Sequence, residues 1–180
     1  MVSIRLFVAL DVPAGARTAL AAFRDAAATP EVWRPVADEA LHVTLAFLGH
    51  RPEEDVEAAA AVIAGLPAAA PPLRIAGALL LPPRRARVLC AALADDEGML
   101  SPLQAAASAG LEAAGLYIPE RRPFRPHVTV ARLRAGARAP REVTAAPDPV
   151  TFRGEAVTLY QSRLGRSGAR YEPLATKPLV

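Results

Sequence analysis

The chain has 180 residues, 52% of them hydrophobic, and a formal net charge of +3 at neutral pH. This length is that of one domain with a substantial core, and the hydrophobic fraction excludes a disordered chain. The single cysteine, Cys90, excludes an internal disulfide and fits a reducing cytosol, so we expect a cytoplasmic protein. Lys177 is the only lysine, and the arginine-rich balance permits a phosphate or nucleic-acid partner.

The residue patterns predict alternating strands and helices along the first half of the chain. In order, these are a strand over 5–12, a helix over 14–28, an extended piece over 33–36, a strand over 41–48 and a helix over 52–64. We expect Gly49 to end the second strand and Pro52 to lie in the first turn of the second helix. Asp11 and Pro13 interrupt the N-terminal apolar run, and prolines break the apolar region over 56–81, so neither a signal peptide nor a membrane span is expected.

The second half continues with the same kinds of element. In order, the pattern predicts strands over 73–80 and 87–93, a helix over 101–114, a loop over 119–126, a strand over 127–133, a short helix around 141–144, and strands over 149–152, 156–162 and 169–175. Gly115 is expected to cap the long helix. A glycine-bearing hairpin loop over 164–168 joins the last two strands.

A four-residue pattern occurs twice, as His42-Val43-Thr44-Leu45 and as His127-Val128-Thr129-Val130. Because successive side chains of a strand point to opposite faces, each copy puts its His and Thr on one face and two aliphatic residues on the other. Two of the three histidines in the chain lie in these motifs. The repetition predicts a paired site carried by two strands.

Two simpler interpretations stand beside the catalytic one. A single histidine on a strand is more often structural than catalytic, and histidine is also the commonest metal ligand. Zinc sites close with three or four ligands at tight spacing, whereas His42 and His127 lie 85 positions apart (127 − 42) and outside any HxH, HxxxH or CxxC pattern. Repetition of the whole unit favours catalysis, and we expect no metal at the site.

The halves of the chain repeat a strand–helix–strand order. A strand around Phe7 precedes a helix and the first His strand, and a strand around Cys90 precedes a helix and the second. The separation of these leading strands, 83 positions (90 − 7), is nearly that of the histidines. We infer a duplicated unit whose two lobes face each other across a cleft.

Two imidazoles on opposite sides of an anionic centre suit an in-line displacement, because one removes a proton from the attacking oxygen and the other protonates the leaving oxygen. Thr44 and Thr129 are expected to donate hydrogen bonds to phosphate oxygens, and Arg125 and Arg132 to offset the charge. The symmetry of the motifs does not decide which histidine is the acid. Without a glycine-rich phosphate loop or a carboxylate cluster for magnesium, the reaction is expected to need no metal or cofactor.

The paired motifs resemble those of the two-histidine phosphoesterase superfamily, and their surroundings are similar to its bacterial and archaeal RNA 2′,3′-cyclic phosphodiesterases, first described as 2′-5′ RNA ligases. The matching segments are 5–10, 41–49, 122–132, 157–162 and 170–174. The resemblance implies an α+β fold with a single two-lobed domain over 1–180. In that fold, two antiparallel-rich sheets have helices packed outside and a central cleft between them.

The same resemblance implies roles for the motif residues. His42 is expected to protonate the leaving oxygen and His127 to activate water, while Thr44 and Thr129 hold the phosphate. The implied reaction opens a 2′,3′-cyclic phosphate to a 2′-phosphate on RNA ends or nucleotides, with tRNA halves among the candidates, and the protein is expected to act as a monomer. The alternatives are RNA 2′-5′ ligation or another nucleotide phosphodiester as the main reaction, and a non-catalytic nucleotide- or RNA-binding module on the same fold.

Further site candidates lie outside the motifs. Tyr160 and Ser162 share a strand face and are predicted to line the cleft with Arg132, the alternative being a core tyrosine with a satisfied hydroxyl. Phe7 and Phe47 are candidates for stacking a base, but aromatic residues on apolar strands favour the core. Five arginines are candidates for guiding an RNA backbone, or serve only solubility: Arg121, Arg122, Arg163, Arg166 and Arg170.

Overall fold

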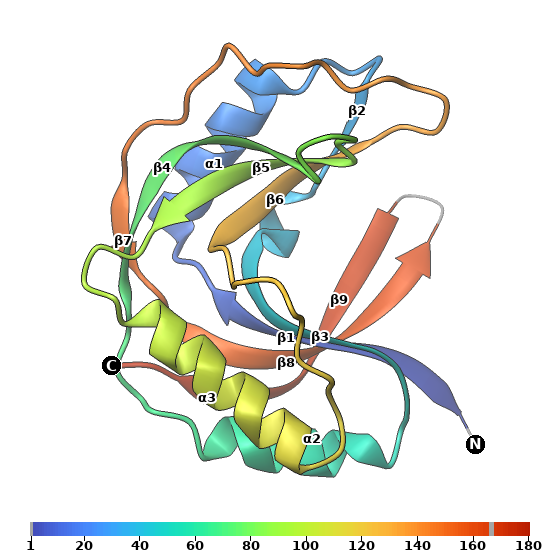
Figure 1. Ribbon diagram of the computed structural model, residues 1–180, viewed down its shortest axis with the longest axis vertical. Coiled ribbons are helices and arrows are strands. Elements are labelled where there is room, and N and C mark those ends of the chain that lie inside the picture. The colour runs from blue at the N-terminus through green and yellow to red at the C-terminus, as the bar shows by residue number, and fades with distance from the viewer. Residues whose placement is uncertain (1, 166–167) are drawn as a thin grey trace.

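The computed structural model describes residues 2–165 and 168–180, which form nine strands, three α-helices and one short 3₁₀ turn (Figure 1). In chain order they are β1 (Ser3–Asp11), α1 (Ala14–Ala27), β2 (Trp33–Pro35), η1 (Asp38–Ala40), β3 (His42–Pro52), α2 (Asp55–Ala64), β4 (Pro72–Leu81), β5 (Val88–Ala94), α3 (Leu100–Ala113), β6 (His127–Leu133), β7 (Thr151–Arg153), β8 (Ala156–Gly165) and β9 (Gly168–Pro178). The predicted α+β class is confirmed.

The strands form one path of hydrogen-bonded neighbours in the order β7-β4-β5-β6-β3-β1-β8-β9, with β2 paired to β6. All pairings in the described part of the chain are antiparallel. Over the same residues, β3 meets β6 at one residue pair, Val43 with Val128. The two predicted sheets are therefore the two halves of one sheet, and Figure 1 shows them diverging from this junction.

Helices α1 and α3 each pack on strands of the other repeat. Helix α1 follows β1 in the chain but contacts β6 and β7, whereas α3 follows β5 but contacts β3 (Figure 1). Helix α2 packs beside α3 and against β8 and β9. The buried face of α3, with Leu100, Leu103 and Leu111, is the apolar stripe expected of such a helix. Each repeat thus contributes its helix to the core of the other half.

Several predicted boundaries are wrong. Strand β3 continues through Gly49, whose φ of +73° suits a residue without a Cβ, and ends at Pro52, so α2 begins only at Asp55. The short helix expected around 141–144 does not form, because prolines interrupt the segment between β6 and β7. In the hairpin loop expected over 164–168, residues 166 and 167 lie outside the described residues.

A β-bulge lies at the last residue of the first motif. Opposite β3, Ala9 of β1 pairs with Thr44 and Val8 pairs with Ala46, which leaves Leu45 as an extra residue. The carbonyl of Leu45 accepts a hydrogen bond from Gln104 Nε2 at 3.1 Å. Helix α3 therefore satisfies a backbone group that the bulge leaves outside the strand ladder.

A second bulge lies at the equivalent place in β6. Cys90 of β5 pairs with Thr129 and the next pair along involves Ala131, so Val130 is the extra residue. Its carbonyl accepts a hydrogen bond from the backbone N–H of Val36 at 2.9 Å. This register corrects the predicted alignment of the halves, since Ala9, rather than Phe7, occupies the place equivalent to Cys90.

Within residues 2–165 and 168–180, none of the helices combines the length and the apolarity that crossing a bilayer requires.

Candidate active site

The two motifs present their polar side chains on one face of the sheet. Val43 and Val128 are fully buried and lie opposite each other, so the His and Thr of each motif point away from the core. Because β3 and β6 run antiparallel through this pair, a local two-fold axis passes between the two valines. The same axis relates one motif to the other.

The register through the valine pair sets how the four polar residues lie. The local two-fold axis relates His42 to His127 and Thr44 to Thr129, so the two histidines lie diagonally across the valine pair. This arrangement suits two imidazoles on either side of one phosphate.

Both imidazoles are held by the same local hydrogen bond. Nδ1 of His42 lies 2.8 Å from the carbonyl oxygen of Ala40, and Nδ1 of His127 lies 2.6 Å from that of Arg125. A carbonyl oxygen only accepts, so Nδ1–H donates in each case and the neutral ring has its lone pair on Nε2. His42 Nε2 accepts from the Thr44 hydroxyl at 3.1 Å. Nε2 is therefore the atom that each ring offers to a substrate.

Aromatic rings surround His42. Its ring centroid lies 4.9 Å from that of Phe7, 5.3 Å from that of Tyr171 in an edge contact, and 6.5 Å from that of Tyr160. Phe7 is buried, as expected, and also packs on both tyrosines. These contacts hold the imidazole on the β1–β9 side of the site.

Burial lowers the pKa of His42 to about 4. The hydrogen bond to Ala40 opposes this shift, whereas the positive charges of Arg132 and His127 add to it. In the protein without substrate, His42 is neutral at neutral pH.

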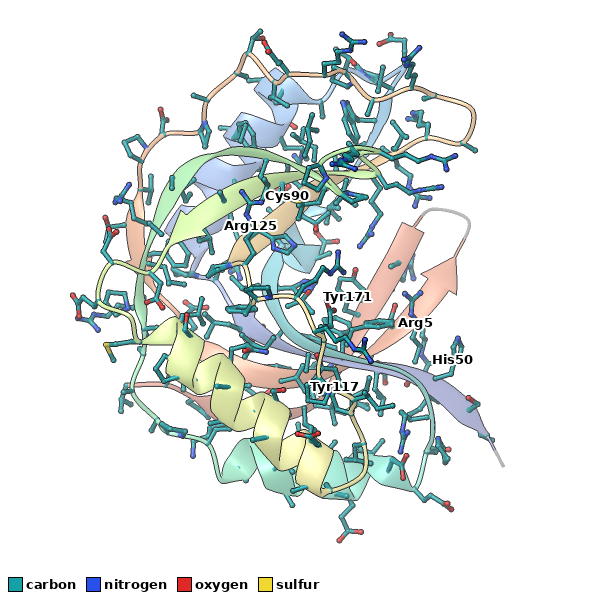
Figure 2. All side chains as sticks on the ribbon, viewed as in Figure 1. Arg5, His50, Cys90, Tyr117, Arg125 and Tyr171 are labelled. Atoms are coloured by element: carbon teal, nitrogen blue, oxygen red, sulfur yellow. The ribbon has the colours of Figure 1, made fainter. Side chains whose placement is uncertain are left out.

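Arginines and a thiol surround the second motif. The Thr129 hydroxyl lies 3.6 Å from Cys90 Sγ, and Figure 2 shows Cys90 and Arg125 on the β5–β6 side of the site. Burial raises the pKa of the Cys90 thiol to about 11, although Thr129, Arg132 and Arg125 act in the opposite direction. Cys90 is therefore a neutral thiol beneath Thr129, with two guanidinium groups nearby.

Arg132 reaches the site because of the bulge. It lies three residues after Thr129, and in a regular strand an odd spacing would place it on the opposite face. The extra residue Val130 restores it to the face of the motif. Its exposed side chain and its effect on the pKa of His42 agree with this placement.

The prediction that Phe47 belongs to the core is wrong. Phe47 follows Thr44 by three residues, across the other bulge, and its side chain is 44% exposed. The Arg5 guanidinium lies 4.7 Å from the centre of its ring, a cation–π contact. Figure 2 shows Arg5 and Tyr171 on the β1–β9 side of the site. Phe47 therefore presents an aromatic face to solvent, two residues past the bulge that follows Thr44.

The Tyr160 hydroxyl has a structural partner. It donates to Asp11 Oδ1 at 2.8 Å, and the Thr158 hydroxyl donates to Asp11 Oδ2 at 2.7 Å. Burial raises the pKa of both Tyr160 and Asp11. Tyr160 therefore contributes its ring, rather than its hydroxyl, to the surroundings of His42.

Ser162 and Tyr171 lie on the neighbouring strands β8 and β9. Ser162 pairs with Tyr171 across the β8–β9 hairpin. Tyr171 was not among the predicted site residues, although it contacts His42 directly. The signal that would have found it is the hairpin itself, because the register places Tyr171 opposite a residue that was predicted.

The arginines predicted to guide RNA have different surroundings. Arg122 pairs with Glu120 at 3.2 Å, and Arg163 pairs with Glu172 at 2.8 Å. Arg121 and Arg170 are exposed. Arg166 lies outside the described residues.

Comparisons with known proteins show the family of this chain. Residues 12–166 match the 2′-5′ RNA ligase superfamily. The chain belongs to this superfamily. It is 34% identical over 176 residues to the RNA 2′,3′-cyclic phosphodiesterase of Escherichia coli, an alignment that covers 94% of this chain and 93% of the relative.

Solved structures show the same superfamily fold. TT0787 of Thermus thermophilus has a TM-score of 0.84 and 31% identity, covering 98% of each chain. E. coli LigT complexed with 3′-AMP has a TM-score of 0.82 and 28% identity, covering 99% of each chain.

Over the residues that the structure describes, no group of three or more His, Cys, Asp and Glu side chains is arranged to hold a metal ion. A cavity of about 1340 Å³ lies elsewhere, at the β4–β5 hairpin, and neither motif histidine lines it.

Proposed function

We propose that this superfamily member hydrolyses the 2′,3′-cyclic phosphate at the 3′ end of RNA, leaving a 2′-phosphate. The observation that supports the proposal is the pair of imidazoles related by a local two-fold axis, each held through Nδ1, which leaves Nε2 available to a substrate. The relatives named RNA 2′,3′-cyclic phosphodiesterase support the choice of substrate. We further propose one catalytic domain over 1–180 that acts as a monomer in the cytoplasm, with tRNA halves among its substrates.

In the proposed reaction, His127 Nε2 takes a proton from a water molecule, and the water oxygen attacks phosphorus. The bond between phosphorus and the 3′ oxygen breaks on the opposite side. His42, in its protonated form, gives a proton from Nε2 to that leaving oxygen. One P–O bond forms, another breaks, and the enzyme regains its starting state after a proton passes from His127 to His42 through solvent.

The remaining site residues bind the phosphate in this proposal. The Thr44 and Thr129 hydroxyls donate hydrogen bonds to the non-bridging oxygens, and Arg132 offsets the charge that develops on them. Arg125 supplies the carbonyl that orients His127 and a second positive charge nearby. Ser162, opposite Tyr171 on the β8–β9 hairpin, lines the edge of the site in this proposal.

The acid role requires His42 to gain a proton when substrate binds. In the empty site His42 is neutral, because burial and the charges of Arg132 and His127 lower its pKa to about 4. A phosphodiester anion placed between the rings favours the imidazolium and raises this pKa again. Binding and protonation are therefore coupled.

The exposed ring of Phe47 is our candidate for stacking the terminal base. Unpaired RNA bases commonly stack on aromatic side chains, and the Arg5 guanidinium lies over the Phe47 ring, so a base would stack on the opposite face.

The direct test uses purified, EDTA-treated protein and an oligonucleotide that ends in a 2′,3′-cyclic phosphate. We expect turnover with only a 2′-phosphate product. A 3′-phosphate product, or no product, would contradict the proposal. Adding an RNA with a 5′-hydroxyl end to the same assay measures ligation against hydrolysis.

A further inference from the structure

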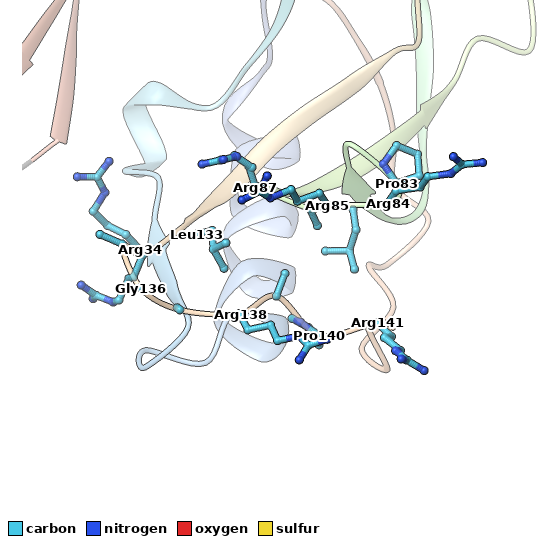
Figure 3. A pocket seen from close by; sticks show the side chains of 16 residues that line it. Arg34, Pro83, Arg84, Arg85, Arg87, Leu133, Gly136, Arg138, Pro140 and Arg141 are labelled. Atoms are coloured by element: carbon cyan, nitrogen blue, oxygen red, sulfur yellow. The ribbon is translucent and has the colours of Figure 1, made fainter.

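An arginine-rich cavity lies beyond the active site, between β2, the β4–β5 hairpin and the segment after β6 (Figure 3). Its volume is about 1340 Å³, and seven of the 16 residues that line it are arginine. These seven are Arg34, Arg84, Arg85, Arg87, Arg134, Arg138 and Arg141. We call this group the arginine pocket, and it shares no member with the arginines that the sequence singled out.

The charge of the arginine pocket is not balanced by the protein. No acidic side chain lines the pocket, and among the described residues none of its seven guanidinium groups forms a salt bridge. All seven side chains are exposed. Like charges gathered in this way repel one another, so a bound anion would stabilise the arrangement.

The shape and chemistry of the pocket favour a polyphosphate chain over a single ion. Arginine binds phosphate through a planar fork of donors. The volume exceeds the range of roughly 300–1,000 Å³ that is usual for small-molecule sites. The charges also come from three separate segments, so a ligand that meets them all must carry several phosphates.

The arginine pocket is connected to the active site through one pair of arginines on neighbouring strands. Arg34 pairs with Arg132 across the β2–β6 strands, and residues directly opposite each other share a face of the sheet. The Val130 bulge in turn places Arg132 on the face of β6 that carries His127 and Thr129. A strand of RNA with its terminal phosphate between the histidines therefore meets positive charge at Arg132, then at Arg34, and then in the pocket.

We infer that the arginine pocket binds the phosphate backbone of single-stranded RNA on the 5′ side of the terminal nucleotide. The inference rests on the proposed function and makes it narrower, because it assigns the enzyme a preference for oligonucleotide ends over free cyclic mononucleotides.

The test compares two triple variants that lose the same formal charge. The pocket variant is Arg84→Gln, Arg85→Gln and Arg138→Gln, three residues that lie away from Arg132. The matched control is Arg51→Gln, Arg74→Gln and Arg153→Gln, outside the pocket. Thermal unfolding of both establishes that they fold. Each is assayed on a single-stranded oligonucleotide of about eight nucleotides with a cyclic-phosphate end, and on a 2′,3′-cyclic mononucleotide.

We expect the pocket variant to lose at least tenfold in kcat/KM on the oligonucleotide. On the mononucleotide, its kcat/KM should equal that of the wild type. The slope of log(kcat/KM) against log[salt] on the oligonucleotide should become shallower by about 2, since each phosphate contact on a single strand contributes about 0.7. The control should match the wild type on both substrates. Equal losses on the two substrates, an unchanged oligonucleotide rate, or an equal loss in the control would overturn the inference.

Binding separates this inference from the proposed function. Fluorescence anisotropy with an oligonucleotide ending in a 2′-phosphate should show at least tenfold weaker binding to the pocket variant than to the wild type, with the control unchanged. If the wild type turns over neither substrate, the proposed function is wrong. The anisotropy measurement still tests whether the arginine pocket binds RNA. Tighter binding of polyglutamate than of the oligonucleotide would assign the pocket to an acidic protein and overturn the inference.

Discussion

Val43 and Val128 lie opposite each other where β3 meets β6, and each is the second residue of its four-residue motif. An apolar contact in the core therefore defines the two-fold axis of the polar site on the other face. The position of each histidine relative to the other depends on this pair.

Replacing either valine should damage activity beyond its effect on stability. We expect Val128→Ala to lower the free energy of unfolding by about 2 kcal/mol, because the side chain is fully buried. It should also lower kcat/KM at least tenfold, since small displacements of catalytic groups are costly. Urea unfolding and turnover of a cyclic-phosphate oligonucleotide measure the two effects. Val157→Ala, at a buried position of β8, should cost similar stability with nearly wild-type activity, and equal activity in the two variants would contradict this account.

The bulge after Thr44 depends on helix α3. Gln104→Ala removes the donor to the Leu45 carbonyl and should lower the free energy of unfolding by about 1–3 kcal/mol. Because the bulge positions Thr44, activity should fall as well. Chemical denaturation and the cyclic-phosphate assay test both points, with the exposed Glu112→Ala on the same helix as control. A Gln104→Ala protein as stable as that control would show that the bulge needs no such support.

The sequence predicts the site better than it predicts what surrounds it. Period-two alternation correctly places the His and Thr of each motif on one face, because the strands are regular up to Thr44 and Thr129. It fails three residues later, at Phe47 and Arg132, because an extra residue shifts the face. These bulges depend on hydrogen bonds to Gln104 and Val36, which are distant in sequence.

The duplication is visible in the sequence, but the exchange of helices is not. Strand–helix–strand order predicts which elements exist. The packing of α1 on β6 and of α3 on β3 depends on long-range tertiary contacts, which local patterns do not reveal. Similarly, Tyr171 enters the site only through the β8–β9 register. Local patterns therefore predict the motifs, and long-range contacts decide their neighbours.

Tyr160→Phe separates structural from catalytic use of the tyrosine. Loss of the hydroxyl leaves the half-buried Asp11 with one donor fewer, so the free energy of unfolding should fall by about 1–3 kcal/mol. The ring remains beside Phe7, so kcat/KM should change less than threefold. Differential scanning calorimetry and steady-state kinetics provide the two readings. A hundredfold loss of activity at unchanged stability would instead place the hydroxyl on the substrate.

The pKa of His42 should rise when phosphate binds. Without ligand, its low pKa keeps the ring neutral above about pH 4. An anion beside the ring stabilises the charged form, so adenosine 2′-monophosphate should shift the NMR titration of His42 to higher pH and cause proton uptake on binding. The same titration without nucleotide provides the reference. A His42 titration that the nucleotide leaves unmoved would be inconsistent with its role as the acid.

The most direct measurement of the central claim compares His42→Ala and His127→Ala on two substrates. On the cyclic phosphate, both variants should lose at least a hundredfold in rate while retaining a wild-type fold. The second substrate has sulfur in place of the bridging 3′ oxygen, so its thiolate leaves without being protonated. On this substrate His42→Ala should recover most of the wild-type rate, whereas His127→Ala should remain inactive. Recovery in His127→Ala instead would reverse the two roles, and a wild-type rate in either variant on the cyclic phosphate would contradict the paired mechanism.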